Sequence, residues 1–74
     1  MAIFGHSESS SEPQRLIEVT FQLAPEELRR IAGFLTSRAA EIEAGTFVGG
    51  GRHLRNEHQG LSGYDVIVVP PGAE

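Results

Sequence analysis

The chain has 74 residues, no cysteine, and six basic against ten acidic residues, which gives a net charge of -4. This length is enough for one domain with one small core, and the acidic balance disfavours nucleic acid and anionic membranes as ligands. Without cysteine there is no disulfide and no thiolate zinc site, so we expect a reducing, cytoplasmic environment. Because so small a core gives only marginal stability, binding to a partner subunit is expected to matter.

The first residues predict a short strand followed by a loop. Residues 2–5 include Ile3 and Phe4 and are expected to form the strand, whereas the Ser-rich stretch 7–14, which contains Pro13, is expected to form the loop. The start of the chain lacks the basic and apolar regions of a signal peptide, and no run approaches the ~20 apolar residues of a membrane span. We therefore expect a soluble protein that is not exported.

An alternating pattern over residues 15–23 predicts a half-buried strand. Four apolar side chains fall on one face of this strand, and Glu18, Thr20 and Gln22 fall on the other. One wet face and one apolar face are typical of an antiparallel or mixed sheet that is covered on a single side. The apolar face comprises Ile17, Val19, Phe21 and Leu23.

A long amphipathic helix is predicted over residues 25–44 and is expected to cover this sheet. Pro25 suits the first helical turn, where its missing N–H would be unpaired anyway, and Gly45 suits a left-handed end. Phe34 and Gly33 lie off the apolar stripe, toward solvent. Gly33 is either a tolerated glycine or the site of a close helix–helix contact in a dimer. The stripe comprises Leu28, Ile31, Ala32, Leu35, Ala39 and Ile42.

The C-terminal third is expected to add two more strands. Residues 53–58 fit either a wet edge strand or a loop, since Leu54 is their only strong apolar anchor. Residues 64–69 are expected to form a buried strand that is stopped by two prolines. The path of residues 46–63, which contain a run of three glycines, stays open, and residues 72–74 are expected to form a tail.

Together these elements predict a single α+β domain over residues 1–74. One long helix is expected to pack on a small, mainly antiparallel sheet, with the elements in the order β-β-α-β-β. The expected core comprises Ile17, Val19, Phe21, Leu23, Leu28, Ile31, Leu35, Ile42 and Ile67.

No catalytic motif is present in the sequence. The serines lack an elbow motif, and the glycine run lacks both the Lys-Ser or Lys-Thr pair and the following helix of a phosphate-binding loop. The arginines lack a basic excess and interleaved aromatic residues. We therefore expect no enzymatic activity, no cofactor and no nucleic-acid partner.

A polar cluster in the C-terminal third is the candidate partner-binding surface. In an extended strand, His53 and His58 would point to opposite faces, so metal ligands would not converge there without His6 or a second subunit. We therefore expect no metal site and interpret the cluster as exposed polar residues or interface hydrogen-bonding groups. The candidate residues are Arg52, His53, Arg55, Glu57, His58 and Asp65.

Four segments carry a resemblance to a known group of proteins. They are Glu18-Val19-Thr20, residues 24–35, Asn56-Glu57-His58 and Asp65-Val66-Ile67-Val68. With these segments, most of the chain from residue 15 to 71 resembles the immunity protein 32 family of polymorphic toxin systems, a group of small bacterial proteins. Asn56 stands at the first place of a His-Glu-His-like pattern associated with such proteins, and this departure argues further against a metal site.

The resemblance implies a non-enzymatic protein that binds and neutralises a cognate toxin, or a domesticated relative of one. An acidic module is compatible with a basic toxin, since opposite charges speed association. Two alternatives stay open. One is a structural homo-oligomer, such as a homodimer, motivated by the small core, by Gly33 and Phe34, and by an edge strand that is free to pair. The other is a metal-binding protein that uses His6, His53, Glu57, His58 and Asp65.

Overall fold

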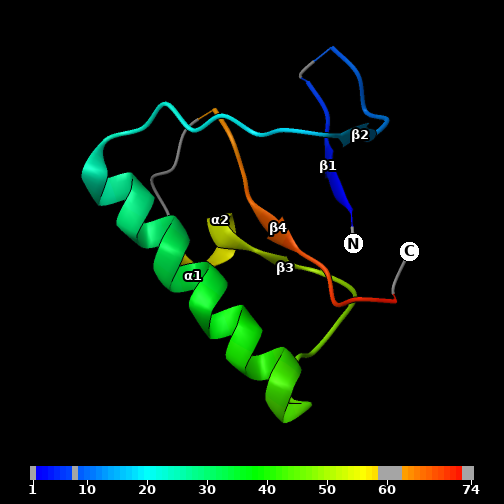
Figure 1. Cartoon of the computed structure of the whole chain (residues 1–74), viewed down its shortest axis with the longest axis vertical. Helices are drawn as coiled ribbons and strands as arrows, with labels where there is room; N and C mark the ends of the chain where they lie inside the picture. The colour runs from blue at the N-terminus through cyan, green and yellow to red at the C-terminus, as the bar shows by residue number, and fades with distance from the viewer. Residues whose placement is uncertain (1, 8, 59–62, 73–74) are drawn as a thin grey trace.

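Two helices and four short strands make up the part of the chain that the computed structural model describes, which is residues 2–7, 9–58 and 63–72 (Figure 1). The α+β class, with one long helix and antiparallel strands, is confirmed. The elements are β1 (Ile3–Gly5), β2 (Gln14–Leu16), α1 (Pro25–Ala44), β3 (Arg52–His53), α2 (Leu54–Glu57) and β4 (Ile67–Val68).

The long helix α1 has the bounds that the sequence predicts. Pro25 lies in its first turn, and Glu26 and Glu27 lie near the positive end of its dipole. The helix ends at Gly45, whose φ of 73° lies in the left-handed region and whose N–H donates to the carbonyl of Ile42. Local signals at both ends of this helix were therefore sufficient to define it.

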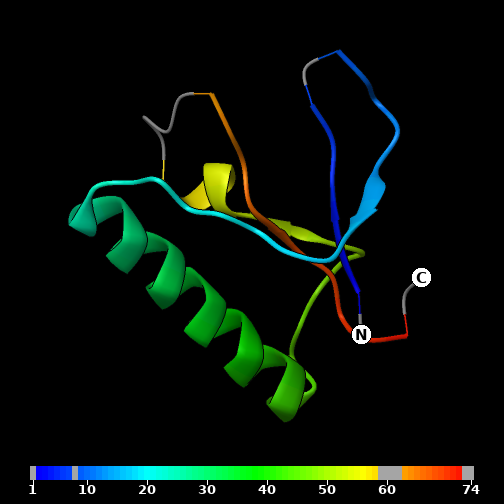
Figure 2. The same cartoon turned by 45° about the horizontal axis from the view of Figure 1, so that its top comes forward.

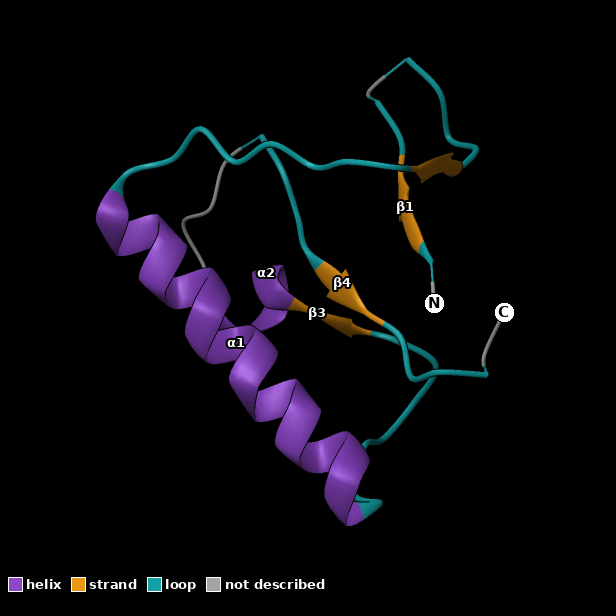
Figure 3. Cartoon of the chain, in the orientation of Figure 1, coloured by secondary structure: helices purple, strands orange, loops and turns teal. Residues whose placement is uncertain are grey.

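The four strands form two separate antiparallel pairs, not one sheet (Figure 3). In the first pair Ile3 lies opposite Leu16, and in the second Arg52 lies opposite Val68. The expected order β-β-α-β-β is interrupted, because α2 stands between β3 and β4. In both views the hairpin of β1 and β2 extends away from α1 (Figures 1 and 2).

The strand predicted over residues 15–23 is wrong in extent, because β2 ends at Leu16. Beyond it the chain runs to the start of α1 as a long trace (Figure 2). Among the described residues, no backbone hydrogen bond joins residues 17–23 to another segment. The alternating pattern is present, but the strand that would pair with it is not. We refer to this stretch as segment 17–23.

The two C-terminal strand predictions are also too long. Residues 54–57 coil into α2, because burial of the Leu54 side chain and a hydrogen bond from the Arg55 N–H to Asp65 hold the first turn of a helix. Only Ile67 and Val68 of the strand expected over 64–69 are paired, since β3 offers just two residues.

Parts of two other predicted segments lie outside the described part of the chain. The Ser-rich loop expected over 7–14 is one residue shorter, because Gln14 begins β2, and its residue 8 is not among the described residues. Residues 73–74 of the expected tail are not among them either.

The core lies between α1, α2 and the segment that leads into β4. Ile31 and Phe34 of α1 are 4% and 3% exposed, and Leu54 of α2 is fully buried. The partly buried side chains of Leu23, Tyr64, Val66 and Val68 pack against these three.

Most of the expected core is exposed. Ile31 alone of the predicted core residues is buried, and Leu23 and Ile42 are half-buried. The helix faces inward with Ile31, Phe34 and Arg38, a row displaced from the predicted stripe, so the prediction that Phe34 points to solvent is wrong. This row is buried because it contains Phe34, the aromatic residue of the helix, and Arg38, which pairs with Glu57 of α2. The exposed residues of the expected core are Ile17, Val19, Phe21, Leu28, Leu35 and Ile67.

Candidate functional site

The structure gathers the six candidate residues around α2. Two lie on β3, two within α2, one directly after it and one on the segment before β4. Direct polar contacts link several of them to each other. We call this set the α2 surface; it comprises Arg52, His53, Arg55, Glu57, His58 and Asp65.

Asp65 fixes the start of α2. The Nδ1 of His53 donates to its Oδ2 at 2.7 Å, and the backbone N–H groups of Arg55 and Val66 donate to its Oδ1 at 3.0 and 2.9 Å. Burial by itself would raise the pKa of the Asp65 carboxyl, but these hydrogen bonds outweigh it and hold the pKa below its ordinary value. Asp65 is therefore an ionised group that ties β3 and α2 to the segment before β4.

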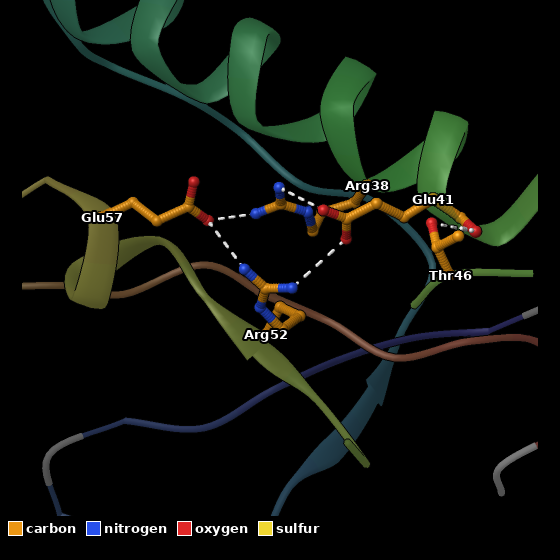
Figure 4. Close-up of polar contacts among 5 residues, drawn as sticks. All are labelled: Arg38, Glu41, Thr46, Arg52 and Glu57. Atoms are coloured by element: carbon orange, nitrogen blue, oxygen red, sulfur yellow. Dashed lines mark hydrogen bonds and ion pairs between the residues drawn. The ribbon is translucent and has the colours of Figure 1, made fainter. Parts of the chain in front are cut away.

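Four charged side chains form a closed ring behind α2 (Figure 4). Arg38 donates to the carboxylate of Glu57 and, at 2.9 Å, to Oε2 of Glu41. Arg52 donates to Oε1 of Glu41 at 3.3 Å and lies 3.9 Å from Oε2 of Glu57. Because the signs alternate, each charge has two opposite neighbours, and the ring joins α1 to β3 and α2.

Arg38 is the buried member of this ring. The residue is 5% exposed, and its guanidinium carbon lies 5.0 Å from the centre of the Phe34 ring. Its Nε has no hydrogen-bond partner among the described residues. Removing a charge this deep from water is costly unless it is paired, so the carboxylates of Glu41 and Glu57 are what keep Arg38 inside.

Sequence reasoning missed Arg38 and Glu41. Arg38 follows Ile31 by seven residues and Phe34 by four, so a stripe drawn through these two apolar residues would also contain Arg38. That spacing was the available signal. The partner, Glu57, lies 19 residues further on, and no local pattern indicates the pairing.

A second tie joins the start of α1 to the residues before β4. The hydroxyl of Tyr64 donates to Oε2 of Glu27 at 3.1 Å. Burial raises the pKa of the Tyr64 hydroxyl, and the hydrogen bond and negative charge of Glu27 raise it further. Together with the charge ring, this contact connects both ends of α1 to the C-terminal third.

The residues of the metal alternative do not assemble into one site in the described part of the chain. His53 binds Asp65, Glu57 belongs to the charge ring, and the Nδ1 of His6 contacts the carbonyl of Ser7 at 3.2 Å in the loop after β1. Among the described residues, no group of three or more histidine, aspartate and glutamate side chains is placed to hold a metal ion. The extended geometry expected for residues 53–58 is wrong, because α2 replaces it.

The polar side chains of the α2 surface are held in place by contacts within the protein and are also exposed to solvent. The side chains of His53, Glu57 and Arg52 are 44%, 36% and 34% exposed, although each makes at least one of the ion-pair contacts above. Such groups offer hydrogen bonds and charges in fixed positions. This arrangement suits recognition of another polar surface.

Within the described residues, neither helix combines the length and apolar character that a membrane crossing needs. Comparison of the chain with protein-family models, curated proteins and solved structures found no match.

Proposed function

We propose that this chain is a non-enzymatic protein-binding module of immunity type, which neutralises a cognate toxin by binding it through the α2 surface. The observation that supports this function most directly is the buried Arg38, which donates a hydrogen bond to the carboxylate of Glu57. This contact fixes α2 in an orientation that leaves its polar side chains exposed. The resemblance to immunity proteins supports the choice of a toxin as the partner.

Fixed side chains favour binding because less conformational freedom is lost on association. In the α2 surface, Asp65 orients the imidazole of His53, and the charge ring orients Arg52 and Glu57. Charged side chains with an exposed side also select partners, since a wrong partner would remove them from water without supplying hydrogen bonds. Both effects suit a module whose task is to recognise one protein.

The charge of the chain supports a basic partner. Its net charge of -4 would attract a basic toxin and speed the encounter. We also propose that the encounter occurs in the cytoplasm, because a chain without cysteine fits a reducing compartment.

The test starts from the gene that neighbours this one in its native genome, which the proposal expects to encode the toxin. Cells that express the toxin should survive when the chain is co-expressed, and the purified proteins should form a complex whose affinity calorimetry measures. Failure to protect the cells and failure to bind the toxin would together contradict the proposed function.

A matched pair of variants tests the binding surface. Arg55→Ala removes an exposed side chain from α2, and Arg29→Ala removes an exposed one from α1, so the two change the net charge equally. Arg55→Ala should weaken binding at least about tenfold, as expected for an interface arginine, whereas Arg29→Ala should leave affinity nearly unchanged. Equal effects of the two variants would rule out the α2 surface as the binding site.

A further inference from the structure

Segment 17–23 has the pattern of a strand and the exposure of an interface. Ile17 is fully exposed, Val19 is 45% and Phe21 is 51% exposed, and all three lie on the face that the alternation marks as apolar. Neither edge of the segment has a partner strand among the described residues. Unpaired backbone beside an apolar face is the feature that recruits another strand.

We propose that a second copy of this chain pairs with segment 17–23, so that two copies form an antiparallel ribbon about a two-fold axis at Thr20. In this register Ile17 lies opposite Leu23 of the second copy, and Val19 lies opposite its Phe21. The arrangement is isologous, since the same residues serve both copies. It involves a different surface from the α2 surface and does not depend on the proposed function.

The register follows from the period of the side chains. Residues that face each other across an antiparallel pair point to the same side of the sheet. A two-fold axis between two residues would therefore set apolar side chains opposite polar ones. An axis at Glu18 would place two like charges directly opposite each other, which is unfavourable. An axis at Thr20 aligns all seven residues and sets Glu18 opposite Gln22.

The single chain exposes more surface than a folded monomer of its mass usually does. A folded monomer of 8.0 kDa exposes about 4,500 Å² by the usual scaling of surface with mass. This chain exposes 5983 Å², an excess of about 1,500 Å². Obligate homodimers bury roughly 1,000 to 2,500 Å² per subunit, so the excess is large enough to contain such an interface, of which segment 17–23 would form one part.

The small size of each sheet also favours a second copy. A two-stranded hairpin alone is marginally stable in water, and a third strand or a packed helix is usually needed. The β1–β2 hairpin leaves Ile3 and Phe4 50% and 54% exposed. In this register each hairpin lies at one end of the ribbon, where Ile17 of its own copy faces Leu23 of the second copy.

Sedimentation equilibrium of the whole chain at micromolar concentration gives the first test. The expected mass is about 16 kDa, twice the 8.0 kDa of one chain. Phe21→Lys should weaken self-association about tenfold, because it replaces the two cross-strand contacts between Phe21 and Val19 with a charge beside an apolar side chain. Leu35→Lys is the matched control, since Leu35 is 43% exposed but lies on α1. A monomeric parent chain, or a Phe21→Lys variant that self-associates as strongly as the parent chain, would overturn the proposal.

A cysteine placed at Thr20 tests the register even if Phe21→Lys fails to fold. The chain has no native cysteine, so any disulfide of a Thr20→Cys variant must join residue 20 of two copies. Opposite residues in an antiparallel pair have Cα atoms about 4.5 to 5.5 Å apart, within the range of a disulfide. Mild oxidation should crosslink Thr20→Cys nearly completely.

Two single-cysteine variants provide the comparison. Gln22→Cys should crosslink slowly, because residue 22 would face Glu18 of the second copy, and Ser37→Cys on the exposed side of α1 should remain monomeric. Equal crosslinking of the three variants would exclude this register. Rapid crosslinking at residue 37 alone would also exclude this register. Protection of segment 17–23 from amide exchange in a monomer would exclude it as well.

Discussion

Helices α1 and α2 bury apolar residues of the kind that segment 17–23 exposes. Phe34 in α1 is 3% exposed, whereas Phe21 in the segment is 51% exposed. The first is enclosed by α2 and by a ring of charges, and the second has no strand beside it among the described residues. The difference shows that an apolar pattern alone does not decide whether a face is buried, because burial also requires a packing partner.

The comparison also shows where stability within one chain originates. Ile31, Phe34 and Leu54 are the buried apolar residues of the described part of the chain, and all come from the two helices. Segment 17–23 contributes mainly through Leu23, which packs against this core from its edge. Substitutions in the helices should therefore affect folding, and substitutions in the segment should affect association.

The largest expected effect distinguishes two phenylalanines. Phe34→Ala should lower the free energy of unfolding by about 3 to 5 kcal/mol, because it leaves a cavity in a small core. Phe21→Ala should cost less than about 1 kcal/mol in dilute solution, with a cost that grows with protein concentration as the dimer forms. Urea unfolding at two concentrations, followed by circular dichroism, measures both. Similar losses in dilute solution would show that the two regions are not distinct.

Arg38→Met should have the next largest effect. The substitution keeps the apolar stem over Phe34 but removes the charge that Glu57 and Glu41 share. We expect a loss of about 2 kcal/mol, less than for a fully buried ion pair because both glutamates are partly exposed. Thermal unfolding measures the loss.

Two further variants test the assignment of this loss to the charge ring. Adding Glu57→Gln to Arg38→Met should recover part of the lost stability, since it removes a carboxylate that lacks a partner. Arg30→Ala breaks an exposed pair with Glu26 and should cost no more than about 0.5 kcal/mol. A cost for Arg30→Ala equal to that for Arg38→Met would mean that burial of the ring adds nothing.

The sequence was sufficient to predict the long helix but not the side that it buries. Pro25 and Gly45 act within their own turns, so both ends of α1 were predictable. Two apolar rows on the helix have equally good spacing, one with Leu28 and Leu35 and one with Ile31 and Phe34. The second is buried because Arg38 beside it finds Glu57, a contact between residues 19 apart that no local pattern specifies.

The sequence predicts which residues belong to the candidate site but not how they are arranged. The polar residues of the C-terminal third do come together, and Leu54, identified as their one strong apolar anchor, is the most deeply buried residue. Their conformation was not predictable, because α2 depends on the Asp65 carboxylate accepting the Arg55 N–H from ten residues away. Segment 17–23 has no partner strand within the described residues, and the proposed dimer would supply one.

Two glycines in and after α1 separate backbone effects from packing effects. Gly45→Ala should cost about 1 kcal/mol, because a φ of 73° is strained for alanine. Gly33→Ala should instead raise stability by about 0.4 to 1 kcal/mol, since an added Cβ meets nothing within 4 Å there. Thermal unfolding measures both. If Gly33 were a close helix–helix contact, Gly33→Ala would dissociate an oligomer, which sedimentation would detect.

The pH dependence of stability should reflect the single aspartate of the chain. Because its hydrogen bonds lower the pKa of Asp65 in the folded state, the stability that they add is fully present above the ordinary value of 3.8 and is lost as the pH falls through the lower folded value. Asp65→Asn should cost about 1 kcal/mol near neutral pH, and its difference from the parent chain should shrink below about pH 4. Urea unfolding between about pH 7 and pH 3 measures this difference.

Glu12→Gln is the control for this pH dependence, since it removes an exposed carboxylate from the Ser-rich loop. Its difference from the parent chain should stay small across the same range. A constant difference for Asp65→Asn would mean that the carboxylate is replaceable by any group of its shape. In that case α2 would be held by the charge ring and Leu54 alone, and the packing of α2 on α1 would depend still more on Arg38.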